Sequence, residues 1–252
     1  MNARLNVLPD RLQQELLQQR RFAADAGHEL RTALTVLRAE LELANRPGRS
    51  LDELQEAVGF AVLETDRLIR LAEQLLLLAR ADEADHRLEV SPTSLRQLLL
   101  DAAEIAVRMR PDVDVDVYAP EETVVRVDRD GVRQAVGNLV HNALAYAPPG
   151  SRVTVGVRTE DRATGPVAVV EVADRGPGFD RAFLARAFER FERGDAAHSV
   201  HGGGHGLGLA ITRSIVRAHG GDASAMNRPG GGALVRLELP QAMSDPLPAP
   251  TR

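Results

Sequence analysis

Two long stretches of the chain repeat apolar residues at the spacing of packed helices. In residues 22–43 four leucines fall at intervals of three and four, and residues 51–79 continue the same repeat for about four heptads. The leucines of the first stretch are Leu30, Leu34, Leu37 and Leu41. This pattern predicts two helices, each with one narrow apolar seam.

The short segment between these stretches predicts an antiparallel helical hairpin. Arg46-Pro47-Gly48 ends the first helix, and Ser50 with Glu53 forms a capping box that begins the second. A lone hairpin buries little apolar surface, so we expect residues 20–81 to pair with a second copy in a four-helix bundle, which makes the chain a homodimer. The alternative is packing of the hairpin on the downstream domain of the same chain.

His28 is displayed by the first predicted helix. At about 100° per residue it points roughly 160° away from the leucine seam, and Thr32, one turn later, shares its face. Glu29 and Arg31 flank it with one charge of each sign. Taken alone, this pattern is typical of an ordinary surface histidine.

The heptad spacing of apolar residues ends after residue 81. A charged segment, residues 82–92, is interpreted as a linker and a first strand, and residues 93–240 mix strands with runs of helix. We expect helices at 94–109, 130–147, 181–188 and 207–219, and strands at 113–118, 123–127, 152–158, 167–173, 222–227 and 233–239. The fold class is therefore α+β, with a helical hairpin followed by a two-layer α/β sandwich. Residues 1–19 are expected to form an N-terminal helix that begins after Pro9, and residues 241–252 a disordered tail.

Composition narrows the function classes. The 252 residues include no Lys and no Cys, which excludes a lysine-based phosphate site, thiol catalysis and cysteine-zinc sites. The net charge of -5 gives no reason to expect nucleic acid. The longest near-apolar run, residues 75–79, is too short to span a bilayer, so we expect no membrane contact by this chain itself. Its expected location is cytoplasmic, with membrane association only through a separate or missing sensor segment.

Three segments of the second domain carry the residue types of a nucleotide site. Asn138 and Asn142 lie four apart on one helix face, where amide oxygens can reach a hard cation, although a solvated polar face is an equal alternative. Asp174-Arg-Gly-Pro-Gly-Phe-Asp180 follows an apolar strand and can approach a flat ligand, or it is an ordinary turn with Asp180 as N-cap. The glycine-rich segment 202–209 leads into a helix, whose N-terminal N–H groups can hold phosphate. It lacks the ending of a P-loop.

From about residue 20 to residue 240 the chain resembles the catalytic core of bacterial sensor histidine kinases. FAADAGHELRTALT is similar to their phosphoacceptor box, and NLVHNALAY, DRGPGFD, FERFERGD and GHGLGL are similar, in order, to the N, G1, F and G2 boxes of their ATP-binding domain. The resemblance implies a fold of the histidine kinase and gyrase ATPase type, with ATP and Mg²⁺ as ligands. It also implies phosphoryl transfer from His28 to an Asp of a response regulator receiver domain.

The resemblance also assigns roles by position. His28 would accept the γ-phosphoryl group, Glu29 would accept a ring proton or orient the imidazole, and Thr32 would orient water for dephosphorylation of the partner. Asn142 would hold Mg²⁺. The implied nucleotide-binding residues are Asn138, Asn142, Tyr146, Asp174, Gly176, Gly178, Phe191, Gly204, Gly206, Leu207 and Gly208.

Three positions depart from the family pattern. Gly27 stands where the family usually has Ser, Ala33 where it has Pro, and Ala145 where it has Lys. The missing Pro and Lys leave open a non-catalytic dimeric scaffold that binds ATP and docks partners. A clamp ATPase of the same superfold is a further alternative, although the phosphoacceptor hairpin argues against it. A zinc-protease motif fails because Thr32 replaces its second ligand, and His198, His201 and His205 form only a loose candidate metal cluster.

Overall fold

The computed structural model describes residues 7–81, 88–163, 165–192, 194 and 205–241. The chain divides into two compact units, Met1–Leu76 and Leu77–Arg252. The predicted tail and most of the predicted linker lie outside the described residues. None of the helices in the described ranges is both long and apolar enough to cross a bilayer.

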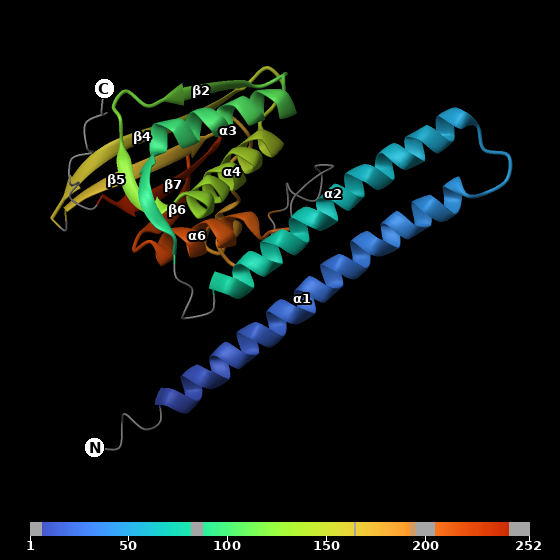
Figure 1. Ribbon diagram of the computed structural model, residues 1–252, viewed down its shortest axis with the longest axis horizontal. Helices are drawn as coiled ribbons and strands as arrows, with labels where there is room; N and C mark the ends of the chain where they lie inside the picture. Colours follow the sequence, from blue (N-terminus) through green and yellow to red (C-terminus); the bar gives the residue numbers. More distant parts are fainter. Residues whose placement is uncertain (1–6, 82–87, 164, 193, 195–204, 242–252) are drawn as a thin grey trace, which may run out of the picture. The chain divides into compact units, whose positions relative to one another are not determined.

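The first unit is built from two long helices that run antiparallel (Figure 1), α1 (Val7–Ala44) and α2 (Leu51–Ala81), and the residues of α2 after Leu76 belong to the second unit. The predicted capping box is present, because the Glu53 N–H donates to Ser50 Oγ at 3.2 Å and the Ser50 N–H donates to Glu53 Oε2 at 2.9 Å. The expected break at Pro9 is absent. Proline is tolerated in the first turn of a helix, where its missing N–H needs no partner, and α1 begins two residues before it.

The apolar stripes of the hairpin are only partly covered within one chain. Ala33 and Leu71 are buried, whereas Leu34 and Leu41 from the predicted seam of α1 are about half exposed. On α2 a heptad-spaced set is likewise exposed: Leu51, Val58, Val62, Ile69 and Leu76. The described part of the hairpin therefore leaves several apolar side chains on both helices exposed to solvent.

The second unit is a two-layer α/β domain. Its strands are β1 (Val90–Ser94), β2 (Asp114–Tyr118), β3 (Val124–Asp128), β4 (Arg152–Arg162), β5 (Gly165–Ala173), β6 (Asp222–Asn227) and β7 (Ala233–Pro240). Its helices are α3 (Leu95–Met109), α4 (Arg129–Tyr146), α5 (Arg181–Leu184) and α6 (Gly208–Ala218). Five strands form one sheet in the order β2-β4-β5-β7-β6, with β2 and β4 parallel and the other pairs antiparallel. The strands β1 and β3 pair separately as an antiparallel ribbon. The predicted α+β class is confirmed.

One face of the five-stranded sheet forms the core. Alternate residues such as Val155, Val170 and Leu237 point to the same side and are buried. The helices α3, α4 and α6 cover this face (Figure 1), and α4 packs closely against α6. The core therefore fixes α4 and α6 side by side on the sheet.

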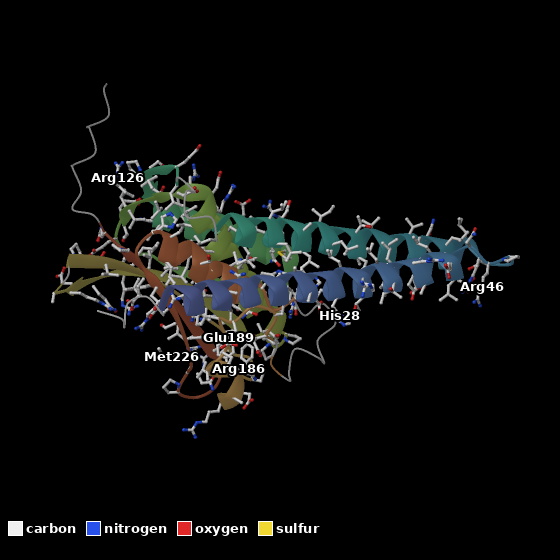
Figure 2. The ribbon with its side chains drawn as sticks, turned by 90° about the horizontal axis from the view of Figure 1, so that it is seen from below. His28, Arg46, Arg126, Arg186, Glu189 and Met226 are labelled. Atoms are coloured by element: carbon white, nitrogen blue, oxygen red, sulfur yellow. The ribbon has the colours of Figure 1, made fainter. Side chains whose placement is uncertain are left out.

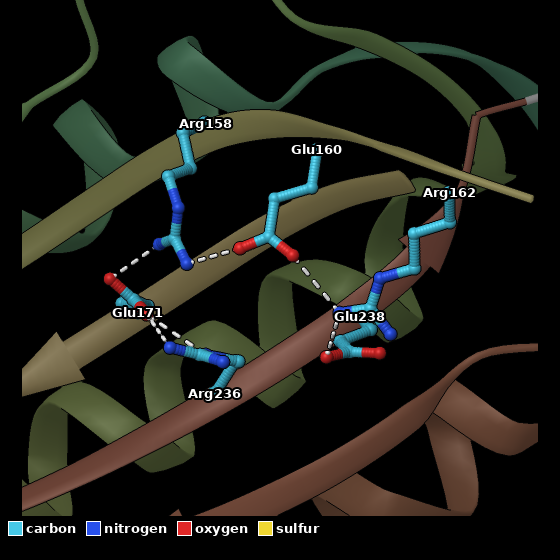
Figure 3. A network of polar contacts seen from close by, with 6 residues as sticks. All are labelled: Arg158, Glu160, Arg162, Glu171, Arg236 and Glu238. Atoms are coloured by element: carbon cyan, nitrogen blue, oxygen red, sulfur yellow. Dashed lines mark hydrogen bonds and ion pairs between the residues drawn. The ribbon is translucent and has the colours of Figure 1, made fainter. Parts of the chain in front are cut away.

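The other face of the sheet carries a network of ion pairs (Figure 3). Glu171 on β5 bridges Arg158 on β4 and Arg236 on β7, each at 2.6 Å. Arg162 bonds both Glu160 and Glu238, at 3.0 and 2.7 Å. Val169 lies opposite Arg158 and Glu238 in the ladder and is fully buried, because long charged side chains cover it with their apolar stems.

The predicted elements occur at their expected places with two main differences. The strand β4 extends to Arg162, four residues beyond its predicted end. The helix predicted at 181–188 ends at Leu184, and single turns follow it, since the N–H of Arg186 bonds the Phe183 carbonyl and that of Glu189 bonds the Arg186 carbonyl.

Candidate active site

His28 lies on the exposed side of α1 (Figure 2). Thr32 is also exposed, and its Oγ1 donates a hydrogen bond to the His28 carbonyl oxygen at 3.0 Å. Ala33, one residue on and about 100° around the helix from Thr32, is buried. The structure thus confirms that His28 and Thr32 share a solvent-facing side of the helix, with half-buried Glu29 beside them.

The helix α4 carries the two asparagines of the second unit. Asp128 caps its N-terminus by accepting from the Gly131 N–H at 3.0 Å. Asn138 and Asn142 are both half-buried on one face, one turn apart. The Asn138 amide donates to the Gly208 carbonyl at 3.4 Å, which ties α4 to the start of α6.

Asp174 directly follows β5 and is only 5% exposed. Its Oδ1 accepts from the N–H groups of Gly176, at 2.8 Å, and Ala233, at 3.1 Å. Burial raises the pKa of this carboxyl above its ordinary value, against the opposing effects of those two N–H groups and of the Arg228 charge. Within the described ranges no group donates to Oδ2, so this oxygen keeps its capacity to accept from a ligand.

Gly176 brings the loop after β5 against the end of α4. A Cβ at this position would lie 2.6 Å from the Tyr146 carbonyl oxygen, so only glycine permits the approach. Tyr146 itself is half-buried. Asp180 is the N-cap residue of α5, as the alternative interpretation of this loop predicts, although its side chain makes no capping hydrogen bond.

The loop before α6 is joined to the segment that contains Phe191. The Phe191 N–H bonds the Gly206 carbonyl at 3.0 Å, and a Cβ on Gly206 would lie 2.6 Å from the Glu192 carbonyl oxygen. Phe191 has a φ of 62°, in the left-handed region that costs a non-glycine residue energy. Leu207 is fully buried, and Gly208 begins α6 directly after it.

These contacts bring four separate sequence segments together in one place. Tyr146 meets Gly176, Asn138 meets Gly208, and Phe191 meets Gly206. The resulting site has a buried carboxylate, two half-buried amides and a helix N-terminus, which suit a base, a cation and phosphate oxygens respectively. Gly204 lies outside the described residues, as do His198 and His201.

Two further residues of this region have no counterpart in the sequence predictions. Asn227 bonds the backbone of Phe179, and Arg228 bonds the carbonyl oxygen of Asp174 at 2.7 Å. The segment Asn-Arg-Pro-Gly-Gly-Gly signals a turn, but nothing in it signals which loop the turn contacts.

Two family models match the chain. Residues 18–84 match the His Kinase A (phospho-acceptor) domain, and residues 127–243 match the histidine kinase-, DNA gyrase B- and HSP90-like ATPase. A solved structure, the mycobacterial sensor histidine kinase MprB, is 30% identical with a TM-score of 0.53. The match covers 61% of this chain and 99% of that one.

The chain belongs to the sensor histidine kinases.

Other members of the family are similar over more of this chain. The probable sensor histidine kinase TcrY of Mycobacterium tuberculosis is 40% identical over 84% of the chain, and the sensor protein IrlS of Burkholderia pseudomallei is 34% identical over 91%. The chain spans only 44% and 48% of their respective lengths. The structure of full-length ShkA in complex with AMPPNP has a TM-score of 0.63 at 25% identity, covering 89% of this chain and 46% of ShkA.

Proposed function

We propose that this chain phosphorylates itself on His28 with ATP and passes the phosphoryl group to an aspartate of a response regulator receiver domain. The observation that carries the proposal is the presence, in one chain, of an exposed histidine on α1 and of a second unit in which four loop and helix segments, one of them carrying buried Asp174, are linked by close contacts. Exposure suits a group that a donor domain and a partner protein must reach in turn.

The reaction requires little covalent help from the protein. A ring nitrogen of His28 forms a bond to the γ-phosphorus as the bond from that phosphorus to the β-phosphate oxygen breaks, and ADP leaves. Glu29 would accept the proton that the imidazole loses, or hold the ring in its reactive orientation. Positioning and charge neutralisation supply most of the rate in such a transfer.

The residues around Asp174 suit ATP. Asp174 Oδ2 would accept a hydrogen bond from the adenine amino group, while Gly176 and Gly178 let the loop pass close to the base. Gly206, Leu207 and Gly208 would border the phosphates at the start of α6, together with Gly204, and Phe191 and Tyr146 would flank the nucleotide. Asn142 would hold Mg²⁺, with Asn138 supporting the phosphates. The metal would neutralise phosphate charge.

We also propose that Thr32 serves a phosphatase activity toward the phosphorylated partner, because its hydroxyl shares the exposed face of His28. Thr32→Ala is expected to leave His28 labelling within about twofold and to slow partner dephosphorylation at least about tenfold, since one positioned water contact is lost. The measurement is loss of label from a phosphorylated receiver domain mixed with each variant. Equal rates for wild type and Thr32→Ala would remove Thr32 from the mechanism, and Thr35→Ala, one turn further from His28, is the matched control.

The kinase proposal is tested by incubation with γ-labelled Mg-ATP. We expect protein-bound label that is stable in alkali, lost in acid and absent from His28→Gln. Nucleotide binding without any label would instead support the non-catalytic scaffold. Release of free phosphate without protein-bound label would support a clamp ATPase.

A further inference from the structure

The turn between β6 and β7, residues 227–232, holds the loop that carries Asp174. The Asn227 side chain forms two hydrogen bonds with one residue, Phe179: its Oδ1 accepts from the Phe179 N–H at 2.7 Å, and its Nδ2 donates to the Phe179 carbonyl at 2.8 Å. Paired bonds of this kind fix both the position and the orientation of the peptide they contact. Asn227 therefore anchors the far end of the loop.

Arg228 anchors the near end of the same loop. Its Nη1 donates to the Asp174 carbonyl oxygen at 2.7 Å. The turn is itself closed, because the Arg228 N–H bonds the Gly232 carbonyl at 2.9 Å and the Gly231 N–H bonds the Arg228 carbonyl at 3.2 Å. These hydrogen bonds fix the backbone of Arg228, and this limits the positions that its guanidinium can take.

Two glycines make the contact between turn and loop unusually close. A Cβ on Gly178 would lie 2.8 Å from Asn227 Oδ1, and a Cβ on Gly232 would lie 2.1 Å from the Asp174 carbonyl oxygen. Both residues also have positive φ, at 78° and 94°. The close approach of the turn to the loop therefore requires glycine in both segments, at Gly232 and at Gly178.

The backbone groups of Asp174 and its Oδ1 are all held by neighbouring protein groups. Its N–H donates to the Ala233 carbonyl at 3.0 Å, its carbonyl accepts from Arg228, and its Oδ1 accepts from Gly176 and Ala233. The orientation of Oδ2 follows from these fixed points. Among the described residues, Arg228 is the charged side chain that acts on this carboxyl, and it lowers a pKa that burial raises. Arg175, the next residue in the chain, is exposed.

We propose that Asn227 and Arg228 are positioning residues for nucleotide binding, which hold the loop from Asp174 to Phe179 in the geometry that recognises adenine. This inference rests on the proposed function, in which Asp174 reads the base. Arg228 fixes the Asp174 peptide and favours the ionised carboxylate over the protonated carboxyl. Only the ionised form offers both oxygens as acceptors, without a proton that competes with the donor of the ligand. Asn227 fixes the loop at Phe179, so that the base meets the carboxylate and not a displaced peptide group.

The role of Arg228 is tested by calorimetric titration of the full chain with Mg-ATP between about pH 5 and 8. Arg228→Met is expected to weaken binding about tenfold or more, the usual effect of losing a charged hydrogen bond. It should also move the acidic loss of affinity to higher pH, because the Asp174 carboxyl then binds its proton more readily. Arg228→Lys keeps the charge and should keep the wild-type pH profile. Arg236→Met, in the ion-pair network of the opposite sheet face, is the matched control and should bind like wild type.

The role of Asn227 is tested by Asn227→Asp, which keeps the acceptor for the Phe179 N–H but sets a carboxylate against the Phe179 carbonyl. We expect about tenfold weaker Mg-ATP binding and a smaller ratio of ATP to GTP affinity. Ser224→Asp adds the same charge on an exposed position of β6 and should change neither value. This pair of variants keeps the inference testable if Arg228→Met fails to fold in a thermal melt.

Folded Arg228→Met and Asn227→Asp variants with wild-type affinity, pH profile and base preference would overturn the inference while leaving the proposed function intact. A wild-type chain that binds no Mg-ATP at all would overturn the proposed function instead. Both variants could also lose affinity for Mg-ATP while Arg228→Met keeps the wild-type pH profile and Asn227→Asp keeps the wild-type base preference. That result would count against positioning, because general destabilisation has that effect.

Discussion

Asp174 shows at the scale of one residue how burial prepares a recognition group. Its carboxyl is nearly covered, and burial raises its pKa. A carboxyl with a raised folded-state pKa contributes stability that is fully present below its unfolded pKa and is lost as the pH rises through the folded pKa. At neutral pH the ionised group therefore costs stability that a ligand with a hydrogen-bond donor can recover.

Asp174→Asn tests this account. The amide keeps an oxygen for the N–H groups of Gly176 and Ala233 but turns an NH₂ group toward the base, so Mg-ATP binding should fall at least about a hundredfold. The apo melting temperature at pH 7 should be unchanged or higher, because the cost of the buried charge is gone. Binding would be followed by calorimetry and unfolding by circular dichroism. A lower melting temperature with near-normal binding would contradict the assignment.

Some features of individual site residues follow from the sequence, and others do not. The exposure of His28 follows from helical geometry, and glycine pairs signalled the loops near Asp174. The contacts of Asn227 and Arg228 did not follow, since they join segments about fifty residues apart through backbone atoms that any sequence contains. These contacts depend on the tight turn between β6 and β7, which contains three glycines with positive φ.

At the scale of elements, local signals predicted most helices and strands. The buried stripe of α4 and the alternation of β4 and β7 follow from periods of 3.6 and 2. The pairing of β1 with β3 as a separate ribbon, and the early end of α5, depend on tertiary contacts. The polar residues on the outer face of the sheet were visible in the sequence, but their connection into one network required the strand register.

Glu171→Gln tests that network. Burial raises the pKa of Glu171, but hydrogen bonds from Arg158 and Arg236 outweigh it and hold the pKa below its usual value. A depressed pKa stabilises the fold above the unfolded pKa, and this contribution is lost as the pH falls through the folded pKa. The substitution should lower the free energy of unfolding by about 1 kcal/mol at pH 7, with the difference disappearing in acid.

Urea denaturation at pH 7 and at about pH 3 measures both values. Glu121→Gln, at an exposed loop position, is the matched control and should change neither. A loss of stability for Glu171→Gln that stays the same in acid would show that packing, and not charge, explains the contribution of Glu171.

At the scale of the whole molecule, the exposed apolar stripe of α2 supports the proposed homodimer. Val62 and Ile69 lie on it, at 55% and 52% exposure, and a surface of this kind is rarely left open in a monomer. The two family models, over residues 18–84 and 127–243, are those of a histidine kinase catalytic core, and the chain spans 44% and 48% of the length of two relatives.

The double variant Val62→Glu/Ile69→Glu should therefore dissociate the dimer, because four like charges would meet in one interface. Sedimentation velocity at micromolar concentration is expected to show a dimer for the wild type and a monomer for the variant. Leu63→Glu places a charge about 100° around the helix and should remain dimeric. A wild-type monomer, or equal dissociation by Leu63→Glu, would contradict the assignment of this stripe.

The proposed function depends on transfer of a phosphoryl group to His28 from ATP bound at Asp174. Its most direct test compares labelling by γ-labelled Mg-ATP with nucleotide binding in three proteins: wild type, His28→Gln and Asp174→Asn. We expect label and binding in the wild type, binding without label in His28→Gln, and neither in Asp174→Asn. Acid-labile label that persists in His28→Gln would contradict it.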